Sequence, residues 1–275
     1  MHRGPAIYAG TYDAATAGLR LPCPDHAGLW PNNGIPYPPL GVLAHLPFAL
    51  AERVLPPSFV HRLLTFSFGL VALASVFLAA RALPRARRWV FVGLFGPLLI
   101  GVGLSGFFDV LWVAAALAAI ERRSLGLAGC SFLLHFRGIG ALAFHRPRWH
   151  WVLVPVLLNV GVAWVAQQHL GEFGANSRVH FSHPASGWLP LTAVVAAYFL
   201  RRDGLAAPLL SVGALMYIDR QVAFWHLTVL VPLAFAALRR APAHRAFVVL
   251  AWCAIVAQAY LDTWVPFPIY WLTQR

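Results

Sequence analysis

The sequence contains no lysine and few charged residues of any kind. Arginine supplies all 21 basic residues, and charged residues make up only 11% of the 275-residue chain. Soluble domains carry about 25% charged residues, so the composition excludes an ordinary soluble protein. Because 60% of the residues are hydrophobic, the composition indicates an integral membrane protein.

Cysteine is also scarce, and this limits the possible chemistry. Cys23, Cys130 and Cys253 are scattered, so they indicate neither a disulfide framework nor a metal-binding spacing. The net charge of +12 is typical of cytoplasmic loops in a membrane protein. No basic patch alternates with aromatic residues, so nucleic-acid binding is excluded. The absence of internal symmetry argues against a transporter built from inverted repeats.

Residues 1–37 are polar and rich in turn residues, with neither a signal peptide nor a membrane span. Apolar segments then fill residues 38–261, which predicts an all-α, polytopic transmembrane bundle of about 8–10 segments. A perpendicular span needs about 20 residues, so we expect some of the shorter segments to be broken or to fail to cross. The segments are 38–55, 62–82, 89–104, 107–120, 125–143, 151–167, 188–200, 204–218, 222–238 and 246–261.

Arginine placement predicts the orientation of these segments. The positive-inside rule places five arginine-bearing turns in the cytoplasm, at residues 81–88, 122–123, 146–148, 201–202 and 239–245. We therefore expect a multi-pass protein of the cytoplasmic membrane whose active face is extracytoplasmic. Residues 1–61, the loop 168–187 and the tail 262–275 would lie outside. Segment 125–143 has arginines at both ends, which predicts a hairpin that enters and returns on one side and turns near His135 and Arg137.

The stretch Tyr37-Pro38-Pro39-Leu40 marks the end of the first loop. Its prolines remove amide donors and fix φ, but they are tolerated in the first turn of a helix. With the long preceding loop, the apolar segment that follows and Pro47, this junction resembles the GT-C superfamily of multi-spanning glycosyltransferases that use polyprenyl-phosphate sugars. An ordinary proline-rich loop-to-helix junction is the alternative. The resemblance implies a further membrane helix before the loop, so we expect the chain as given to begin after it.

The resemblance also implies roles for residues of the first loop. In the family, an acidic residue early in this loop acts as a base or positions the acceptor, which suits a carboxylate within hydrogen-bond reach of a hydroxyl. Asp13 and Asp25 are the acidic residues before the junction, although neither clearly occupies the family position. Asp13 is the catalytic candidate, and Asp25, Tyr37, Pro38 and Pro39 are the substrate-binding candidates. Alternatively, both aspartates are turn or cap residues.

Asp109 follows Ser105-Gly106-Phe107-Phe108 and is surrounded by apolar sequence. A carboxylate there is costly unless it faces a cavity or a partner, and the arginine pattern puts it at the outer end of a helix. It resembles the GT-C element in which a polar residue opens a helix after a short outer turn, so it is the second catalytic candidate. The alternative is a helix-capping aspartate. We expect Asp109 in a cleft open to the outside, with Arg137, Arg178 or Arg220 and together with Tyr37 or Asp13.

Three residues are candidates for binding the donor phosphate. Arg137 follows a Gly-Leu-Ala-type run, where family members commonly carry lysine, and its guanidinium suits phosphate. Arg220 and His226 resemble polar groups of late GT-C helices. The alternatives are snorkelling for Arg137 and a core position for His226. No metal site is predicted from the histidines of loop 168–187, and the need for a divalent cation stays open.

These patterns predict an enzyme that transfers a sugar, of the hexosyl or mannosyl kind, from a polyprenyl-phosphate donor to an extracytoplasmic acceptor. The alternative is a non-catalytic or truncated GT-C-like protein that serves as a subunit in cell-envelope assembly. The expected partners are membrane lipid, the lipid-linked donor and an acceptor that the sequence does not identify.

Overall fold

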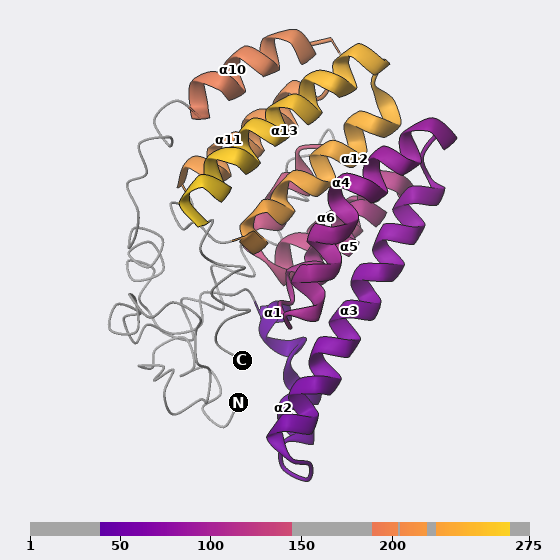
Figure 1. The fold of residues 1–275 in the computed structure, drawn as a ribbon, viewed down its shortest axis with the longest axis vertical. Helices are drawn as coiled ribbons and strands as arrows, with labels where there is room; N and C mark the ends of the chain where they lie inside the picture. Colours follow the sequence, from indigo (N-terminus) through magenta and orange to yellow (C-terminus); the bar gives the residue numbers. More distant parts are fainter. Residues whose placement is uncertain (1–38, 145–188, 203, 219–223, 265–275) are drawn as a thin grey trace.

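The computed structural model describes residues 39–144, 189–202, 204–218 and 224–264 (Figure 1). These ranges consist of helices and short connections, with no strand among them. The prediction of an all-α chain is therefore confirmed. The expected first loop, the segment 151–167, the loop 168–187 and most of the tail 262–275 lie outside the described residues.

Two long helices follow a pair of short ones at the start of the described chain. The short helices α1 and α2 are separated by a turn at Ala44 and His45. The segment 38–55 is therefore broken, and neither part is long enough to cross a membrane. The elements are α1 (Pro39–Leu43), α2 (Leu46–Ala51), α3 (Pro57–Arg81), α4 (Arg85–Leu104) and α5 (Asp109–Arg122).

The remaining elements, apart from α13, are shorter than α5. The first of them, α6, is followed by a 3₁₀ turn and by α7, and the last, α13, is the longest. The elements are α6 (Leu125–Leu134), η3 (Phe136–Gly138), α7 (Ile139–Leu142), α10 (Leu189–Leu200), α11 (Ala206–Ile218), η5 (Phe224–Val229), α12 (Leu230–Arg240) and α13 (Ala243–Trp264).

In the described chain, α3 and α4 are long and apolar enough to cross a membrane. They pack as an antiparallel pair along one side of the molecule (Figure 1). Gly103 of α4 lies against the backbone of Phe68 in α3, and a Cβ there would be only 2.6 Å from the Phe68 carbonyl oxygen. Small residues at such contacts allow two helix backbones to approach closely, as in membrane helix pairs.

The outer face of α3 carries a continuous stripe of exposed apolar side chains. Its members recur every three or four residues, so they lie on one side of the helix. All are at least 40% exposed: Phe59, Leu63, Phe66, Leu70, Leu73 and Phe77. The opposite side of α3 contributes Phe68, Ala72 and Val76 to the core. A helix that is apolar on both its buried and its exposed side is typical of a membrane environment.

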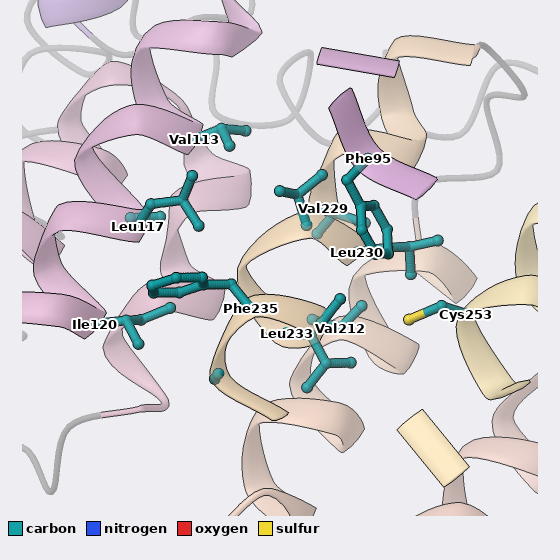
Figure 2. Packing of buried hydrophobic residues seen from close by; sticks show 14 of the residues in the cluster. Phe95, Val113, Leu117, Ile120, Val212, Val229, Leu230, Leu233, Phe235 and Cys253 are labelled. Atoms are coloured by element: carbon teal, nitrogen blue, oxygen red, sulfur yellow. The ribbon is translucent and has the colours of Figure 1, made fainter. Parts of the chain in front are cut away.

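The centre of the bundle is α12, whose residues from Leu230 to Leu238 are all buried. Phe235 points toward Leu117 and Ile120 of α5, and α11 and α13 pack on another side of α12 (Figure 2). A helix that is buried all round must be surrounded by other helices. The order of the segments along the chain does not reveal this position.

Hydrogen bonds join the arginine-bearing helix ends at one end of the bundle. Arg87 at the start of α4 donates to the carbonyls of Leu238 and Ala241 at the end of α12. Arg240 donates to the carbonyl of Ile120 near the end of α5. The turn between α10 and α11 lies at this end as well (Figure 1). Most of the arginines predicted to lie in cytoplasmic turns belong to the first or last turn of a helix in the described chain. The arginine pattern predicts loops at these positions.

Candidate functional site

The chain between Leu125 and Leu142 folds back on itself. His135 ends α6 with extended backbone angles, φ −152° and ψ 136°, and α7 returns along α6. Gly138 makes this reversal possible, because it lies directly on the backbone of Ser131 with no room for a Cβ atom. The chain reverses at His135 and Arg137, where the arginine pattern predicts the turn of the hairpin in segment 125–143. That both ends of this segment lie on one side of a membrane stays a prediction.

The reversal brings Arg137 to Asp109. The Arg137 guanidinium Nη1 lies 3.5 Å from Oδ1 of Asp109. Both side chains are buried, with 2% of Asp109 and 6% of Arg137 exposed. Burying a charge costs free energy unless an opposite charge and hydrogen bonds accompany it. Each of the two groups therefore lowers the cost of burying the other. Asp109 occupies the first turn of α5, directly after the N-cap residue Phe108.

Two further side chains lie beside the carboxylate. Trp112 donates its indole N–H to Oδ1 of Asp109 at 3.1 Å, and His135 Nε2 lies 3.9 Å from the same oxygen. The Arg137 backbone N–H donates to Nδ1 of His135 at 3.1 Å. When His135 is neutral, its ring proton is therefore on Nε2, the nitrogen that faces Asp109. Ser131 fixes the hairpin to α5 by donating to the Trp112 carbonyl at 2.9 Å.

The helix that begins at the Tyr-Pro-Pro junction packs on this cluster. Gly41 of α1 lies directly against the Leu134 carbonyl at the end of α6, next to the ring of Phe108. Phe108 stacks on the imidazole of His135, with ring centroids 5.6 Å apart and planes 21° apart. Pro39, which begins α1, and Asp109 are 70 positions apart in sequence. The packing of α1 on α6 brings the start of α1 and the Asp109 cluster to the same region of the molecule.

His45 follows α1 and extends the aromatic contacts toward α3. Its ring packs edge-on against Phe108 and Phe68, at 5.3 Å and 5.9 Å between centroids. Burial lowers the pKa of His45 below its ordinary value of 6.5, and a hydrogen bond with the Gly41 carbonyl only partly opposes this. The partly buried imidazole is therefore held neutral near pH 7.

The carboxylate of Asp109 is more enclosed than the sequence predicts. We expected a cleft open to the outside, whereas the side chain is 2% exposed and its contacts are buried groups. The expected arginine is nevertheless there, since Arg137 is one of the three cations predicted for the site. In the part of the chain that the structure describes, no three His, Cys, Asp or Glu side chains come together to hold a metal.

Several predicted site residues fall outside the described residues and stay predictions, namely Asp13, Asp25, Tyr37, Pro38, Arg178 and Arg220. Pro39 is the first residue of α1, as expected for a proline that starts a helix. The backbone of His226 lies in η5, which packs on α4, α5 and α13, and its side chain is outside the described set. The structure therefore brings Asp109 and Arg137 together and leaves the other pairings untested.

Two members of the cluster, His135 and Trp112, were absent from the predicted site. His135 carried a usable signal, because it stands beside Arg137 at the turn of the predicted hairpin. Trp112 follows Asp109 by three positions, the spacing at which two residues share one helix face. Its 3.1 Å hydrogen bond to Asp109 joins two residues of the first turn of α5, which begins two residues after the start of the predicted apolar segment.

A comparison with protein-family models, with curated proteins and with solved structures finds no match to this chain. The residues themselves therefore carry the functional argument. In the ranges that the structure describes, they define a helical arrangement with two helices long and apolar enough to cross a membrane, and a buried cluster of acid, guanidinium, imidazole and indole groups.

Proposed function

We propose that this protein is a multi-pass membrane glycosyltransferase of the GT-C type that transfers a sugar from a polyprenyl-phosphate donor to an extracytoplasmic acceptor. The proposal rests on the pairing of Asp109 with Arg137 beneath the helix that begins at the Tyr-Pro-Pro junction. A carboxylate, a guanidinium and this junction are the parts that the resemblance assigns to one site.

The chemistry would be direct displacement at the anomeric carbon of the sugar. The acceptor hydroxyl oxygen forms the new bond to that carbon, and its proton passes to the carboxylate of Asp109. The bond from the anomeric carbon to the phosphate oxygen breaks, and its electron pair leaves with the polyprenyl phosphate. Arg137 would stabilise the charge on this leaving phosphate through its paired N–H donors.

The contact between Asp109 and Arg137 is consistent with an arginine that binds Asp109 in the free protein and the donor phosphate in the complex. At 3.5 Å it is longer than the 2.7–2.9 Å that is ordinary for a charge-assisted hydrogen bond. A donor phosphate would compete with Asp109 for the guanidinium. Loss of that cation raises the basicity of the carboxylate, which is the change that a general base requires. Donor binding would thus prepare Asp109 to accept the proton.

The molecular surface supports a membrane setting for this chemistry. The exposed apolar stripe of α3 is typical of a lipid-facing side, and the arginine-bearing helix ends gather at one end of the bundle. Asp109 opens α5, whereas Arg122 closes it. The candidate site therefore lies at the opposite end of α5 from the arginines, which corresponds to the extracytoplasmic side under the positive-inside rule.

The test is a transfer assay with purified protein in lipid vesicles, using radiolabelled polyprenyl-phosphate mannose and acceptor lipids extracted from the same membrane. Asp109→Asn should abolish transfer while the variant still binds polyprenyl phosphate, and Arg137→Gln should weaken that binding. Arg62→Gln is the matched control, because Arg62 is an exposed arginine on α3. Full transfer by Asp109→Asn, in folded protein, would refute a charge-dependent role for Asp109.

The burial of the pair favours a second candidate, a non-catalytic membrane subunit in cell-envelope assembly. In that role, Asp109 and Arg137 would only lock the α6–α7 hairpin onto α5. Both substitutions would then lower thermal stability, and neither wild type nor variant would transfer sugar or bind polyprenyl phosphate. The same assay therefore separates the two candidates.

A further inference from the structure

The arginine-bearing end of the bundle contains more positive charge than its helix ends use. Arg87 and Arg240 donate to terminal carbonyls of α12 and α5, and Arg88 donates to the Ala80 carbonyl of α3 at 2.9 Å. Such contacts satisfy carbonyls that a helix end leaves without partners. Each guanidinium carries five N–H donors, so one or two carbonyls do not exhaust it.

Part of this excess lies where α5 and α12 end side by side. Arg123, Arg239 and Arg240 lie close together there. Burial lowers the pKa of Arg240, and the positive charges of Arg123 and Arg239 lower it further. Glu121 is the carboxylate that the described chain places beside them, 3.9 Å from Nη1 of Arg239. That Nη1 atom is buried and makes no hydrogen bond within the described residues. Three guanidinium groups beside one carboxylate leave a net positive charge, which favours a further anion.

Aromatic side chains at the same end of the bundle indicate that it lies at the depth of a membrane–water interface. Trp89, one turn after Arg85 in α4, is 72% exposed, and the Arg201 guanidinium lies 4.0 Å from the centre of the Tyr198 ring. Trp and Tyr concentrate at the level of lipid headgroups. The apolar stripe of α3 extends to Phe77, one turn before Arg81. The arginines thus lie where acyl chains would give way to phosphates.

We propose that Arg123, Arg239 and Arg240 form a binding site for the phosphodiester headgroup of an anionic phospholipid such as phosphatidylglycerol. The phosphate would accept from N–H groups of the three guanidinium groups and neutralise their charge, while the acyl chains lie along the exposed apolar surface of the bundle. The Arg239 side chain is 30% exposed. This site is separate from the Asp109 cluster at the other end of α5. It requires the membrane setting but no sugar transfer.

The substitutions can be chosen so that folding is preserved. Arg123 ends α5 in the left-handed conformation, with φ at +52°, and asparagine tolerates this conformation better than other non-glycine residues. Arg123→Asn therefore removes the charge without straining the turn. Arg239→Gln removes the guanidinium whose Nη1 makes no hydrogen bond. Arg53→Gln and Arg62→Gln, which remove exposed arginines near the start of α3, are controls with the same change in net charge.

The experiment measures thermal unfolding of the full chain in phosphatidylcholine nanodiscs, with and without phosphatidylglycerol. Phosphatidylglycerol should raise the Tm of the wild type and of the control double variant equally. The Arg123→Asn, Arg239→Gln double variant should keep the wild-type Tm in phosphatidylcholine alone and lose most of the increase. Its apparent affinity for the lipid should fall about thirtyfold, since two contacts near the surface are lost.

Three outcomes would overturn the proposal. An equal loss in the control variant would show that only net charge attracts the lipid. No increase in the wild type would show that no such site exists. An equal increase from inorganic phosphate in nanodiscs without phosphatidylglycerol would show that the site takes a soluble anion. None of these outcomes depends on sugar transfer, so failure here leaves the proposed enzyme activity a separate question.

Discussion

The guanidinium of Arg137 and the carboxylate of Asp109 are 28 positions apart in sequence and 3.5 Å apart in space. The α6–α7 hairpin produces this contact by reversing the chain at His135. Removing one partner leaves the other charge buried, which costs about 3–5 kcal/mol. We predict that Asp109→Asn and Arg137→Gln each lower the Tm of the protein in detergent markedly.

The double variant separates a true pair from two independent effects. With both charges gone, neither polar group is left as an unpaired ion, so the combined loss should be smaller than the sum of the single losses. A coupling of about 1–3 kcal/mol is expected for directly interacting groups. Additive losses in the double-mutant cycle would contradict the pairing.

Gly138 is the second residue on which the hairpin depends. It lies on the Ser131 backbone with no space for a Cβ atom, so Gly138→Ala must push the two arms of the hairpin apart. Overpacking of this kind costs about 1–3 kcal/mol, and it should also displace Arg137 from Asp109. Gly93→Ala in α4 is the control, because nothing lies within 4 Å of the position of its new Cβ. Thermal unfolding should show a lower Tm for the first variant and no loss for the second.

His45 should make the packing of α1 sensitive to acid. The folded pKa of His45 is below 6.5, so the unfolded chain takes up a proton at a higher pH than the folded chain does. Its contribution to stability is complete above pH 6.5 and is lost as the pH falls toward the folded pKa. His45→Phe keeps a ring against Phe68 and Phe108 but cannot titrate. It should flatten the loss of stability below pH 6.5.

The control for this experiment is His61→Gln, which removes an exposed histidine at the start of α3. That variant should keep the wild-type pH dependence. Hydrogen exchange of the α1 amides at pH 5 and pH 7.5 gives a local measurement of the same effect. Equal pH dependence in wild type and in His45→Phe would assign the acid sensitivity to other groups.

Arg87 is predicted to stabilise the contact between α4 and α12. Its guanidinium donates to the Leu238 and Ala241 carbonyls at 2.8 Å and 2.6 Å, and hydrogen bonds to a charged donor contribute about 2 kcal/mol. Arg87→Gln should lower the Tm, whereas Arg85→Gln, which removes an exposed arginine two positions earlier, should not. Equal effects of the two substitutions would show that charge alone matters at this end.

The membrane topology is tested by reporter fusions along the chain. Cytoplasmic readings are expected wherever the arginine pattern predicts a cytoplasmic turn, after Arg88, Arg123, Arg148, Arg202 and Arg240. External readings are expected after Gly174 and at Arg275. An external reading at Arg88 together with a cytoplasmic reading at Gly174 would reverse the orientation, and it would move Asp109 to the cytoplasmic side.

The sequence alone determined the helical class and most helix positions. Long apolar runs leave the backbone no way to satisfy its hydrogen bonds in an apolar environment except within helices, and arginine clusters interrupt those runs. The start of a helix at Pro39 follows from the geometry of proline. The reversal near His135 was predicted from the arginines at both ends of segment 125–143. These features depend on local chemistry and composition, which a sequence displays directly.

The tertiary structure alone decided which residues meet. The enclosure of α12, the contact of Gly41 with the end of α6, and the bond from Trp112 to Asp109 depend on how apolar helices pack. Because most of the helices are apolar on several sides, their hydrophobic pattern does not specify a buried face. Steric fit at small residues and the pairing of a few buried polar groups select the arrangement instead. For that reason Asp109 and Arg137 were predictable as candidates, but their surroundings were not.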